Sequence, residues 1–267
     1  MRVLEIENLT KEFAKNGKKF KAVNDISFHI NQGECCGLVG ESGSGKSTIA
    51  KMVTRLTPVT SGTIRLLGED ITHIKGKRLR EAYRQMAMVF QMPADSFNPR
   101  MKLGSSIQEV MTNAGMSRSD AQKRVLELMD LVELKRDYVE RYPHQISGGE
   151  CQRAALARAL AVNPKLLICD EATSALDVSV QAQIVSLLKR LQQELGLSYL
   201  LICHDLALVR NICDTVVVMR NGHFVEAGNA VHVIEHPKEE YTKLLVESVF
   251  PIDPTESWTV PEYPMGQ

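Results

Sequence analysis

The sequence lacks any apolar run long enough to cross a membrane. Its longest runs are YLLIC at residues 199–203 and TVVVM at residues 215–219, whereas a membrane-spanning helix needs roughly 20 apolar residues. The opening MRVLEIENLTKEF alternates apolar and polar side chains and has no continuous apolar core of the kind found in signal peptides. We therefore expect a chain that neither spans the membrane by itself nor carries a secretion signal.

An excess of charge of either sign is also missing. Lys and Arg together number 32, as do Asp and Glu, in a chain of 267 residues. A neutral chain has no overall positive field to hold nucleic acid or an anionic membrane. We predict no nucleic-acid partner, and we expect any membrane partner to be met by a local surface. With 44% hydrophobic residues, the chain is long enough for one large domain or two small ones.

The cysteines lack a metal-binding pattern. None forms a CxxC pair, and most lie inside apolar runs, where a free thiol behaves as a small apolar side chain. The six cysteines are Cys35, Cys36, Cys151, Cys169, Cys203 and Cys213. This usage favours a reducing, cytoplasmic setting without a cysteine-bound metal.

Internal repeats and low-complexity tracts are missing as well.

Apolar periodicity predicts an α/β chain. Strand-like alternation at residues 3–6 and 26–30 indicates an antiparallel β region that leads into a buried strand at residues 36–39. Short buried runs then alternate with helical patterns, which is typical of a parallel sheet with helical crossovers. The further predicted strands are residues 86–90, 166–169, 199–203 and 215–219, and the predicted helices are residues 47–53, 117–134 and 184–195.

Caps and prolines indicate where these elements begin and end. Ser117 or Ser119 is a suitable N-cap for the second helix, and Gly196 closes the third. The prolines of QMPADSFNPR, residues 91–100, argue against regular structure there. Near the C-terminus we expect a strand in HFVEAG, a helix in KEEYTKLLVESVF and an irregular proline-rich tail whose Trp258 covers a surface.

The stretch GESGSGKST, residues 40–48, predicts a phosphate-binding loop. It matches G-x-x-x-x-G-K-[ST], in which glycines let backbone N–H groups turn toward phosphate oxygens. The loop follows a predicted strand and opens a predicted helix, so the helix dipole adds to the attraction for phosphate. We expect Lys46 to bridge the β- and γ-phosphates, Ser47 to bind Mg²⁺ and Thr48 to lie near the α-phosphate. The other loop residues expected to bind nucleotide are Gly40, Ser42, Gly43, Ser44 and Gly45.

Two carboxylates follow the apolar run KLLIC. Asp170 and Glu171 stand at the predicted carboxyl end of a buried strand, where a parallel sheet meets its nucleotide. By itself, such a pair would more often cap the next helix. Together with the phosphate loop, it predicts that Asp170 joins the Mg²⁺ shell. Glu171 is then the base that polarises the attacking water, because a base must lie within one hydrogen bond of the proton it accepts.

A second glycine-containing turn, ISGGE at residues 146–150, opens a predicted helix at residues 150–160. Its Ser147, Gly148 and Gly149 form another place where a helix start can meet phosphate. One triphosphate does not need two such places. The second one makes sense if it closes over a nucleotide held by another subunit.

Together these motifs resemble the ATP-binding subunits of ABC transporters over roughly residues 1–247. The resemblance implies an α/β P-loop NTPase with the ABC ATPase fold. In that fold a parallel-sheet, RecA-like core carries an antiparallel β region and a helical subdomain, here about residues 92–152. Residues 248–267 are left as the proline-rich tail. The resemblance also implies ATP and Mg²⁺ as cofactors and ATP hydrolysis as the activity.

The resemblance assigns roles to further residues. Phe13 falls where the family stacks an aromatic ring on adenine, and Phe20 is the alternative because the spacing is ambiguous. Gln91 matches the glutamine that touches Mg²⁺ and relays the nucleotide state to the helical subdomain. His204 matches the histidine that contacts the γ-phosphate, and Asp177 matches an aspartate at the dimer interface.

The second turn departs from the family's commonest sequence, LSGGQ. Ile146 is a conservative change, and Glu150 adds a carboxylate at a position where the family tolerates variation. We therefore expect a subunit that hydrolyses ATP. We also expect Gly149→Asp to spare ATP binding by the isolated chain and to impair hydrolysis that depends on pairing.

The segments MVFQMPADSFNPRM and HPKEEYTKLLVESVF are similar to those of importers for oligopeptides, dipeptides and nickel. The resemblance implies two permease subunits, a second related ATPase that usually forms a heterodimer, an extracellular solute-binding protein and a peripheral position at the cytoplasmic face of the membrane. Some members carry C-terminal cysteines for an iron–sulfur cluster, and we expect none here because no cysteine follows Cys213. The solute, whether a peptide, nickel or another chelated metal, stays open.

Two other functions remain as alternatives. A soluble ABC ATPase outside transport usually has two cassettes in one chain or a long coiled-coil insertion, and neither is present. A P-loop kinase or GTPase has no use for ISGGECQRAALARAL, and no guanine-reading N-K-x-D follows the phosphate loop.

Overall fold

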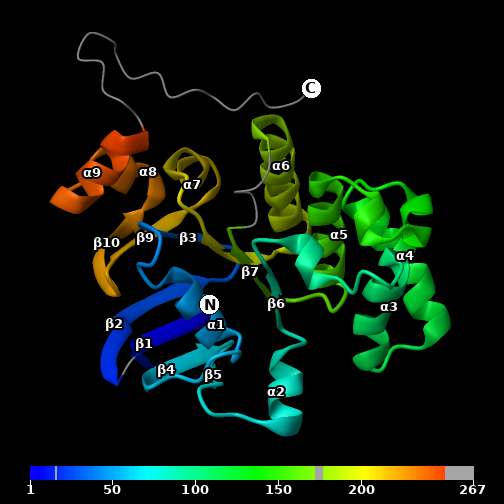
Figure 1. Ribbon diagram of the computed structural model, residues 1–267, viewed down its shortest axis with the longest axis horizontal. Coiled ribbons are helices and arrows are strands. Elements are labelled where there is room, and N and C mark those ends of the chain that lie inside the picture. The colour runs from blue at the N-terminus through cyan, green and yellow to red at the C-terminus, as the bar shows by residue number, and fades with distance from the viewer. Residues whose placement is uncertain (16, 172–176, 250–267) are drawn as a thin grey trace.

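Two β-sheets form the framework of the chain, and helices pack around them (Figure 1). The structure is a computed structural model, and it describes residues 1–15, 17–171 and 177–249. All six cysteines are free and buried. Within the described ranges, no helix combines the length and the apolar character needed to cross a membrane.

The first sheet is antiparallel and has the strand order β2-β1-β4-β5. It confirms the predicted antiparallel β region, but its first two strands extend well beyond residues 3–6 and 26–30. The register between them shifts at several places, including between Ile6 and Leu9. Such irregularities interrupt the alternation of side chains, so the sequence pattern revealed only the regular pieces. The strands are β1 (Arg2–Lys15), β2 (Lys18–Asn31), β4 (Ser61–Leu66) and β5 (Glu69–Asp70).

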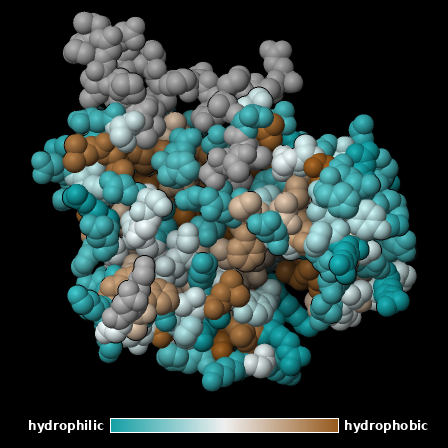
Figure 2. All heavy atoms as spheres, in the orientation of Figure 1, coloured by the Kyte–Doolittle hydropathy of each residue, from teal (hydrophilic) through white to brown (hydrophobic). Residues whose placement is uncertain are grey.

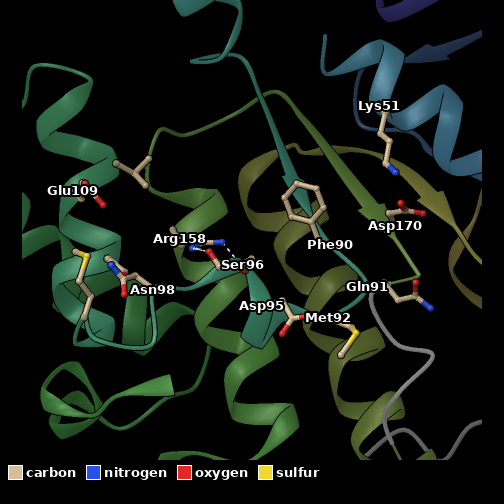
Figure 3. A pocket seen from close by; sticks show the side chains of 13 residues that line it. Lys51, Phe90, Gln91, Met92, Asp95, Ser96, Asn98, Glu109, Arg158 and Asp170 are labelled. Atoms are coloured by element: carbon tan, nitrogen blue, oxygen red, sulfur yellow. Dashed lines mark hydrogen bonds between the residues drawn. The ribbon is translucent and has the colours of Figure 1, made fainter. Parts of the chain in front are cut away.

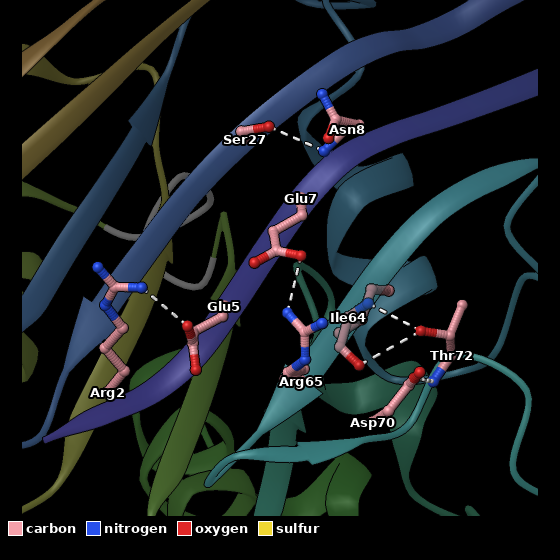
Figure 4. A network of polar contacts seen from close by, with 9 residues as sticks. All are labelled: Arg2, Glu5, Glu7, Asn8, Ser27, Ile64, Arg65, Asp70 and Thr72. Atoms are coloured by element: carbon pink, nitrogen blue, oxygen red, sulfur yellow. Dashed lines mark hydrogen bonds and ion pairs between the residues drawn. The ribbon is translucent and has the colours of Figure 1, made fainter.

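One face of this sheet carries polar contacts (Figure 4). Arg65 of β4 lies 2.7 Å from Glu7 of β1, and Arg2 lies 2.8 Å from Glu5 along β1. The side chains that alternate with them are buried beneath the sheet, as a strand with one wet face requires. These buried residues include Leu4, Ile6 and Ile64.

The second sheet has six strands in the order β10-β9-β3-β8-β7-β6 and positions the functional residues. All neighbouring strands pair in parallel except β10, an antiparallel edge strand. β3, β7 and β8 are buried along their whole length, as central parallel strands covered on both faces should be. The parallel sheet predicted from the buried runs is therefore confirmed. The strands are β3 (Cys35–Val39), β6 (Met86–Val89), β7 (Leu166–Asp170), β8 (Ser198–Ile202), β9 (Thr215–Arg220) and β10 (His223–Asn229).

Helices cover both faces of the second sheet. One apolar cluster fills the space between this sheet, the first sheet and α1, and the other joins the opposite face to the later helices. The helices are α1 (Lys46–Val53), α2 (Gly76–Ala82), α3 (Leu103–Asn113), α4 (Arg118–Leu131), α5 (Gly148–Leu160), α6 (Val178–Leu195), α7 (Leu206–Ile212), α8 (Ala230–Glu235) and α9 (Glu240–Val249).

The segment between β6 and β7 contains α3, α4 and α5, which group together at one side of the molecule in Figure 1. The helical subdomain predicted at about residues 92–152 falls in this segment. α5 continues to Leu160, and the limits of the subdomain stay a prediction. Figure 2 shows a mostly hydrophilic surface over α3 and α4, with apolar atoms gathered in the hollow beside them.

Two local predictions were wrong in detail. The helix predicted at residues 117–134 ends at Leu131, because Glu133 takes a positive φ of 58° that stops the helix. Its predicted cap is confirmed, since the Ser117 side chain accepts a hydrogen bond from the Asp120 N–H. In QMPADSFNPR a 3₁₀ helix, η1 (Pro93–Ser96), forms where no regular structure was expected. Pro93 stands at its first position, where a missing N–H does no harm.

The C-terminal helix lies within KEEYTKLLVESVF, residues 238–250, where a helix was predicted. α9 reaches Val249, two residues beyond the boundary at residue 247. The remainder of the predicted tail, including Trp258, lies outside the described residues.

Candidate functional site

The predicted phosphate loop joins β3 to α1 and can be built only from glycine at two positions. Gly40 has a φ of 144° and Gly45 a φ of 104°. A Cβ atom would lie 2.1 Å from the Met219 carbonyl oxygen at Gly40 and 2.3 Å from the Ala22 carbonyl oxygen at Gly45. Both distances are impossible for an L side chain, so these glycines let the loop lie against its neighbours.

Lys46 begins α1 and points back into this loop. Its Nζ donates hydrogen bonds to the Gly40 and Glu41 carbonyl oxygens, both at 2.7 Å, and to Ser44 Oγ at 3.3 Å. The side chain is buried. Burial lowers the pKa of Lys46, and the carboxylates of Glu171 and Asp170 act in the opposite direction. The ammonium group is thus held against the oxygens of the loop itself.

Ser47 and Asp170 meet although 123 residues separate them. The Ser47 hydroxyl donates to Asp170 Oδ1 at 2.9 Å. Asp170 is the last residue of β7 and is buried. Burial raises the pKa of Asp170, against the hydrogen bond from Ser47, and the neighbouring Glu171 raises it further. An oxygen-rich pair therefore stands beside the phosphate loop.

Strand register brings the remaining predicted catalytic residues to the same edge. Asp170 pairs with Ile202 of β8, and Ile202 pairs with Leu38 of β3, so these three strands end side by side. Glu171 follows β7, and its N–H donates to the Ile202 carbonyl oxygen at 2.9 Å. His204 is exposed just after β8.

Gln91 reaches Glu171 from the neighbouring strand. β6 pairs with β7 as far as Val89 and Cys169, and Gln91 follows two residues later. Its Nε2 donates to Glu171 Oε2 at 2.6 Å. Glu171 has a φ of 48°, an unusual value for a residue with a Cβ. The glutamine and the carboxylate that the sequence assigned to catalysis are therefore in direct contact.

A groove of about 750 Å³ adjoins this edge of the sheet (Figure 3). Gln91 and Asp170 line one end, and α3 and η1 line the other. Two exposed apolar side chains, Phe90 and Met92, flank Gln91 along the groove. Arg158 of α5 supports η1 by donating to the Ser96 carbonyl oxygen at 2.6 Å and to its hydroxyl at 2.7 Å. The groove was not predicted, because its walls come from distant segments.

The second turn is a capped helix start. Ser147 is the N-cap of α5, and its side chain accepts a hydrogen bond from the Glu150 N–H at 3.3 Å. Glu150 Oε2 in turn accepts from the Ser147 N–H at 2.8 Å, while Tyr138 donates its hydroxyl to Glu150 Oε1 at 2.6 Å. The hydrogen bond from Tyr138, followed by that from the Ser147 backbone, lowers the pKa of Glu150. The carboxylate that departs from the common signature therefore completes a capping box.

This second turn lies apart from the phosphate loop within the chain. α5 packs mainly on α3, α4, α6, β6 and η1, whereas α1 packs on β2 and β7. The start of α5 approaches α6 so closely that a Cβ at Gly149 would lie 2.5 Å from Val180 Cγ1. Asp177, the exposed N-cap of α6, precedes Val180 by three residues. The two groups predicted at a subunit interface are thus neighbours.

The close approach at Gly149 changes one expectation. From the sequence we expect Gly149→Asp to spare ATP binding by the isolated chain. Its side chain would instead meet Val180 inside the same chain, so this substitution does not separate pairing from folding. A substitution at the exposed Ser147 makes the cleaner test.

The predicted adenine-stacking residues lie together on the first sheet. Phe13 and Phe20 are direct cross-strand partners in β1 and β2, with ring centroids 5.8 Å apart. Both rings are exposed. The Lys11 ammonium lies 4.9 Å from the Phe13 ring centroid. The choice between the two rings stays open, because both belong to one aromatic pair.

The other predicted loop residues lie between the end of β3 and the first turn of α1. Gly43 has a φ of 81° and open space where a Cβ would be. The Gly222 N–H donates to the Ser44 carbonyl oxygen at 3.0 Å and fixes the back of the loop. Ser42 is exposed at the tip, and Thr48 lies in the first turn of α1.

Comparisons with known proteins agree with this geometry. The sequence profile described as ABC transporter matches residues 23–174. The chain is 44% identical over 256 residues to the oligopeptide transport ATP-binding protein OppF of Streptococcus mutans, covering 95% of this chain and 83% of that protein. It is 45% identical over 259 residues to the dipeptide transport ATP-binding protein DppF of Lactococcus lactis subsp. cremoris, with coverage of 95% and 83%.

Solved structures share the fold. The dimeric, post-hydrolysis structure of the ATP-binding cassette MJ0796 bound to ADP and Pi superposes with a TM-score of 0.78 at 27% identity, covering 85% of this chain and 98% of the other. The cbiO1 structure from Clostridium perfringens gives a TM-score of 0.79 at 26% identity, covering 94% and 96%. The fold prediction is confirmed, and the chain belongs to the ABC transporter family.

Proposed function

We propose that this chain is the ATP-hydrolysing subunit of a membrane importer for peptides. One observation carries the proposal: the ends of β3, β6 and β7 bring Lys46, the Ser47–Asp170 pair and the Gln91–Glu171 pair to one edge of the sheet. These are the groups that phosphoryl transfer to water requires. Membership of the ABC transporter family and relatives named for ATP binding support the same activity.

Each residue has a role that follows from its chemistry. Lys46 and the loop N–H groups bind the β- and γ-phosphates. A water oxygen attacks the γ-phosphorus, the bond from that phosphorus to the β-γ bridging oxygen breaks, and Glu171 accepts the proton of the water. Gln91 orients Glu171 through their 2.6 Å hydrogen bond, and His204 contacts the γ-phosphate. An exposed aromatic pair, Phe13 with Phe20, offers a surface for the adenine ring.

The donor set fits a magnesium ion. Ser47 Oγ and Asp170 Oδ1 are hard oxygen donors 2.9 Å apart, and Mg²⁺ prefers such ligands together with phosphate oxygens. Ser47, Asp170 and the side-chain amide of Gln91 would hold the ion. When bound, it supplies positive charge that neutralises the phosphate oxygens.

The second turn supports a site completed by another subunit. Ser147, Gly148 and Gly149 open α5 away from the phosphate loop of their own chain, and Asp177 stands beside them. A helix start attracts phosphate, so this surface suits the γ-phosphate of a nucleotide held by a second cassette. The partner is a second copy or a related ATPase, and the importers that this chain resembles usually use the latter.

The groove beside Gln91 suits a segment of a permease. It is lined by apolar and polar side chains from two parts of the chain and begins at a residue that contacts the catalytic carboxylate. A segment seated there would respond to movement of α3 and η1 when nucleotide binds. Two permease subunits fed by a solute-binding protein would place this chain at the cytoplasmic face of the membrane, with ATP as its fuel.

Peptides are favoured over the other solutes. The relatives reported above are named for oligopeptide and dipeptide transport, which supports peptides more than nickel or another chelated metal. A soluble ABC ATPase outside transport is less well supported, because nothing in those names points to it. A kinase or GTPase would leave the capped turn at Ser147 without a role.

Uptake in the native host tests the proposal. A strain without this chain should lose accumulation of a labelled oligopeptide and regain it with the wild-type chain. Glu171→Gln, which keeps the shape of the side chain but removes the base, should fail to restore uptake although the protein is present on the membrane. Labelled nickel is measured in parallel. Unchanged peptide uptake in the deleted strain would contradict the peptide assignment, and full rescue by Glu171→Gln would contradict the assigned base.

A further inference from the structure

The C-terminal helix touches the phosphate loop through one hydroxyl group. Tyr241, in the first turn of α9, accepts a hydrogen bond at its hydroxyl oxygen from the backbone N–H of Glu41, at 3.1 Å. The two residues are 200 positions apart. Tyr241 is 5% exposed, so water does not readily replace this bond.

Glu41 also bonds to the key lysine. Its carbonyl oxygen accepts from Lys46 Nζ at 2.7 Å, and Gly40 beside it lies against the Met219 carbonyl oxygen. The Gly40–Glu41 peptide group therefore donates its N–H to Tyr241 of α9, while its C=O, the Gly40 carbonyl, accepts from Lys46 Nζ at 2.7 Å. This one peptide connects the C-terminal helix to the ammonium group that meets phosphate.

Tyr241 is held firmly from two sides. The Arg220 guanidinium, at the end of β9, lies 4.7 Å from the centroid of its ring. Glu226 of β10 accepts hydrogen bonds from the N–H groups of Lys238 and Glu239, both at 3.1 Å, and so fixes the chain just before α9. The first support comes from β9, which pairs with β3, and the second from β10, which pairs with β9.

We propose that Tyr241 is a positioning residue for the phosphate loop, and that α9 is through it a structural part of the nucleotide site. The inference rests on the proposed ATP binding. The hydroxyl holds the Gly40–Glu41 peptide group in the orientation that presents the Gly40 carbonyl to Lys46. Without the hydroxyl the loop samples other orientations, and the ordering of Lys46 and the loop must then be supplied by the nucleotide.

Tyr241→Phe removes the hydroxyl and keeps the ring that stacks on Arg220. We expect the dissociation constants for ATP and ADP to rise by about twofold to tenfold, the value of one hydrogen bond. We also expect the Glu41 amide to exchange with deuterium faster, while the amides of α9 keep wild-type exchange rates. Both are measured on the full chain, by calorimetry and by residue-resolved hydrogen exchange.

Tyr83→Phe is the matched control. Its hydroxyl donates to the Thr54 carbonyl oxygen at 3.1 Å, at the far end of α1, so its loss should leave the exchange of the Glu41 amide unchanged. Glu226→Gln is a second variant, which weakens the attachment of α9 without touching the loop. It should also raise the ATP dissociation constant, but by a smaller factor than Tyr241→Phe does.

Wild-type ATP affinity and wild-type exchange at Glu41 in Tyr241→Phe would overturn the inference. The inference would also be overturned if the α9 amides of Tyr241→Phe exchange faster while the Glu41 amide keeps its wild-type exchange rate. Tyr241 would then act only in packing. If the wild-type chain binds no ATP, the proposed function fails instead, and the exchange at Glu41 still tests the contact.

Discussion

At the scale of single residues, we propose that Lys46 carries the largest share of phosphate binding. Its ammonium is buried among the Gly40 and Glu41 carbonyl oxygens. A buried cation surrounded by carbonyl groups is already desolvated, so its attraction for a polyphosphate is strong.

Lys46→Ala should raise the dissociation constant for ATP at least severalfold, because the variant removes the only side-chain cation that the sequence assigns to the phosphates. Calorimetric titration with ATP measures the dissociation constant. Lys77→Ala serves as control, since Lys77 is exposed on α2, and it should bind ATP nearly as the wild type does. Equal affinity in Lys46→Ala and wild type would refute the phosphate-loop assignment.

Asp170 illustrates how a functional group can destabilise the fold. Burial raises its pKa above the ordinary value of 3.8. When folding raises the pKa of an acid, the free energy of unfolding falls as the pH rises from the ordinary pKa through the pKa of the folded state. At neutral pH the folded chain therefore carries an unfavourable buried carboxylate.

Asp170→Asn should raise the melting temperature of the nucleotide-free chain at pH 7 by a few degrees, because the amide can still accept from Ser47 without carrying charge. The same variant should lose Mg²⁺-dependent ATP hydrolysis. Asp130→Asn is the contrasting control: Arg136 lowers the pKa of Asp130, so its neutralisation should bring no gain in stability. A lower melting temperature for Asp170→Asn would contradict the claim that the ionised Asp170 carboxylate destabilises the folded chain at neutral pH.

At the scale of elements, the start of α5 depends on Glu150. The carboxylate accepts from the Ser147 N–H and from Tyr138, and these bonds lower its pKa below the ordinary value of 4.5. When folding lowers the pKa of a carboxylate, the ionised group stabilises the fold at any pH above its ordinary pKa. This stabilisation is lost as the pH falls through the lower pKa of the folded state. The cap is therefore intact at neutral pH and fails in acid.

Glu150→Gln should cost about 1 kcal/mol of unfolding free energy at pH 7, the usual value of a capping interaction. Urea unfolding at several pH values measures it. The difference from wild type should shrink as the pH falls below about 4.5, where the carboxylate of the unfolded wild-type chain becomes protonated first and that of the folded chain at lower pH. A difference that stays constant down to pH 3 would mean that the charge of Glu150 does not stabilise the cap.

The same elements explain how much the sequence could predict. Lys46, Asp170 and Glu171 were found because each follows directly from a buried strand or opens a helix, so a local pattern marks it. The S-x-x-E pattern of Ser147 and Glu150 was also visible, and it would have predicted the capping box. Tyr241 carries no local signal, because its partner Glu41 is 200 residues away.

Helix ends and packing distances were the harder part. The end of α4 depends on the positive φ of Glu133, a residue type that does not usually stop a helix. The approach of Gly149 to Val180 depends on how α5 and α6 cross, which no periodicity specifies. Local chemistry could therefore be predicted, whereas contacts between elements had to be observed.

At the scale of the whole molecule, the proposed hydrolysis requires two cassettes. The phosphate loop lies on α1, and the capped turn at Ser147 lies on the helical group at another part of the chain (Figure 1). Each nucleotide would then be held by the loop of one chain and covered by the turn of the other.

The most direct test of this arrangement compares Ser147→Asp with Ser147→Asn. The two side chains have the same shape, but only Asp places a negative charge where the γ-phosphate of the partner's nucleotide should lie. Because Ser147 Oγ lies 2.9 Å from Glu150 Oε2, the melting temperatures of the two isolated chains are compared as well, and they must agree for the comparison to test pairing. ATP affinity is measured on the isolated chain, and hydrolysis is measured in the assembled transporter, at each composite site separately. We expect equal ATP affinity in both variants, and hydrolysis at least tenfold slower for Asp than for Asn at the site that this turn completes. Weaker ATP binding by the isolated Ser147→Asp chain, or equal hydrolysis by the two variants in the complex, would contradict the two-cassette site.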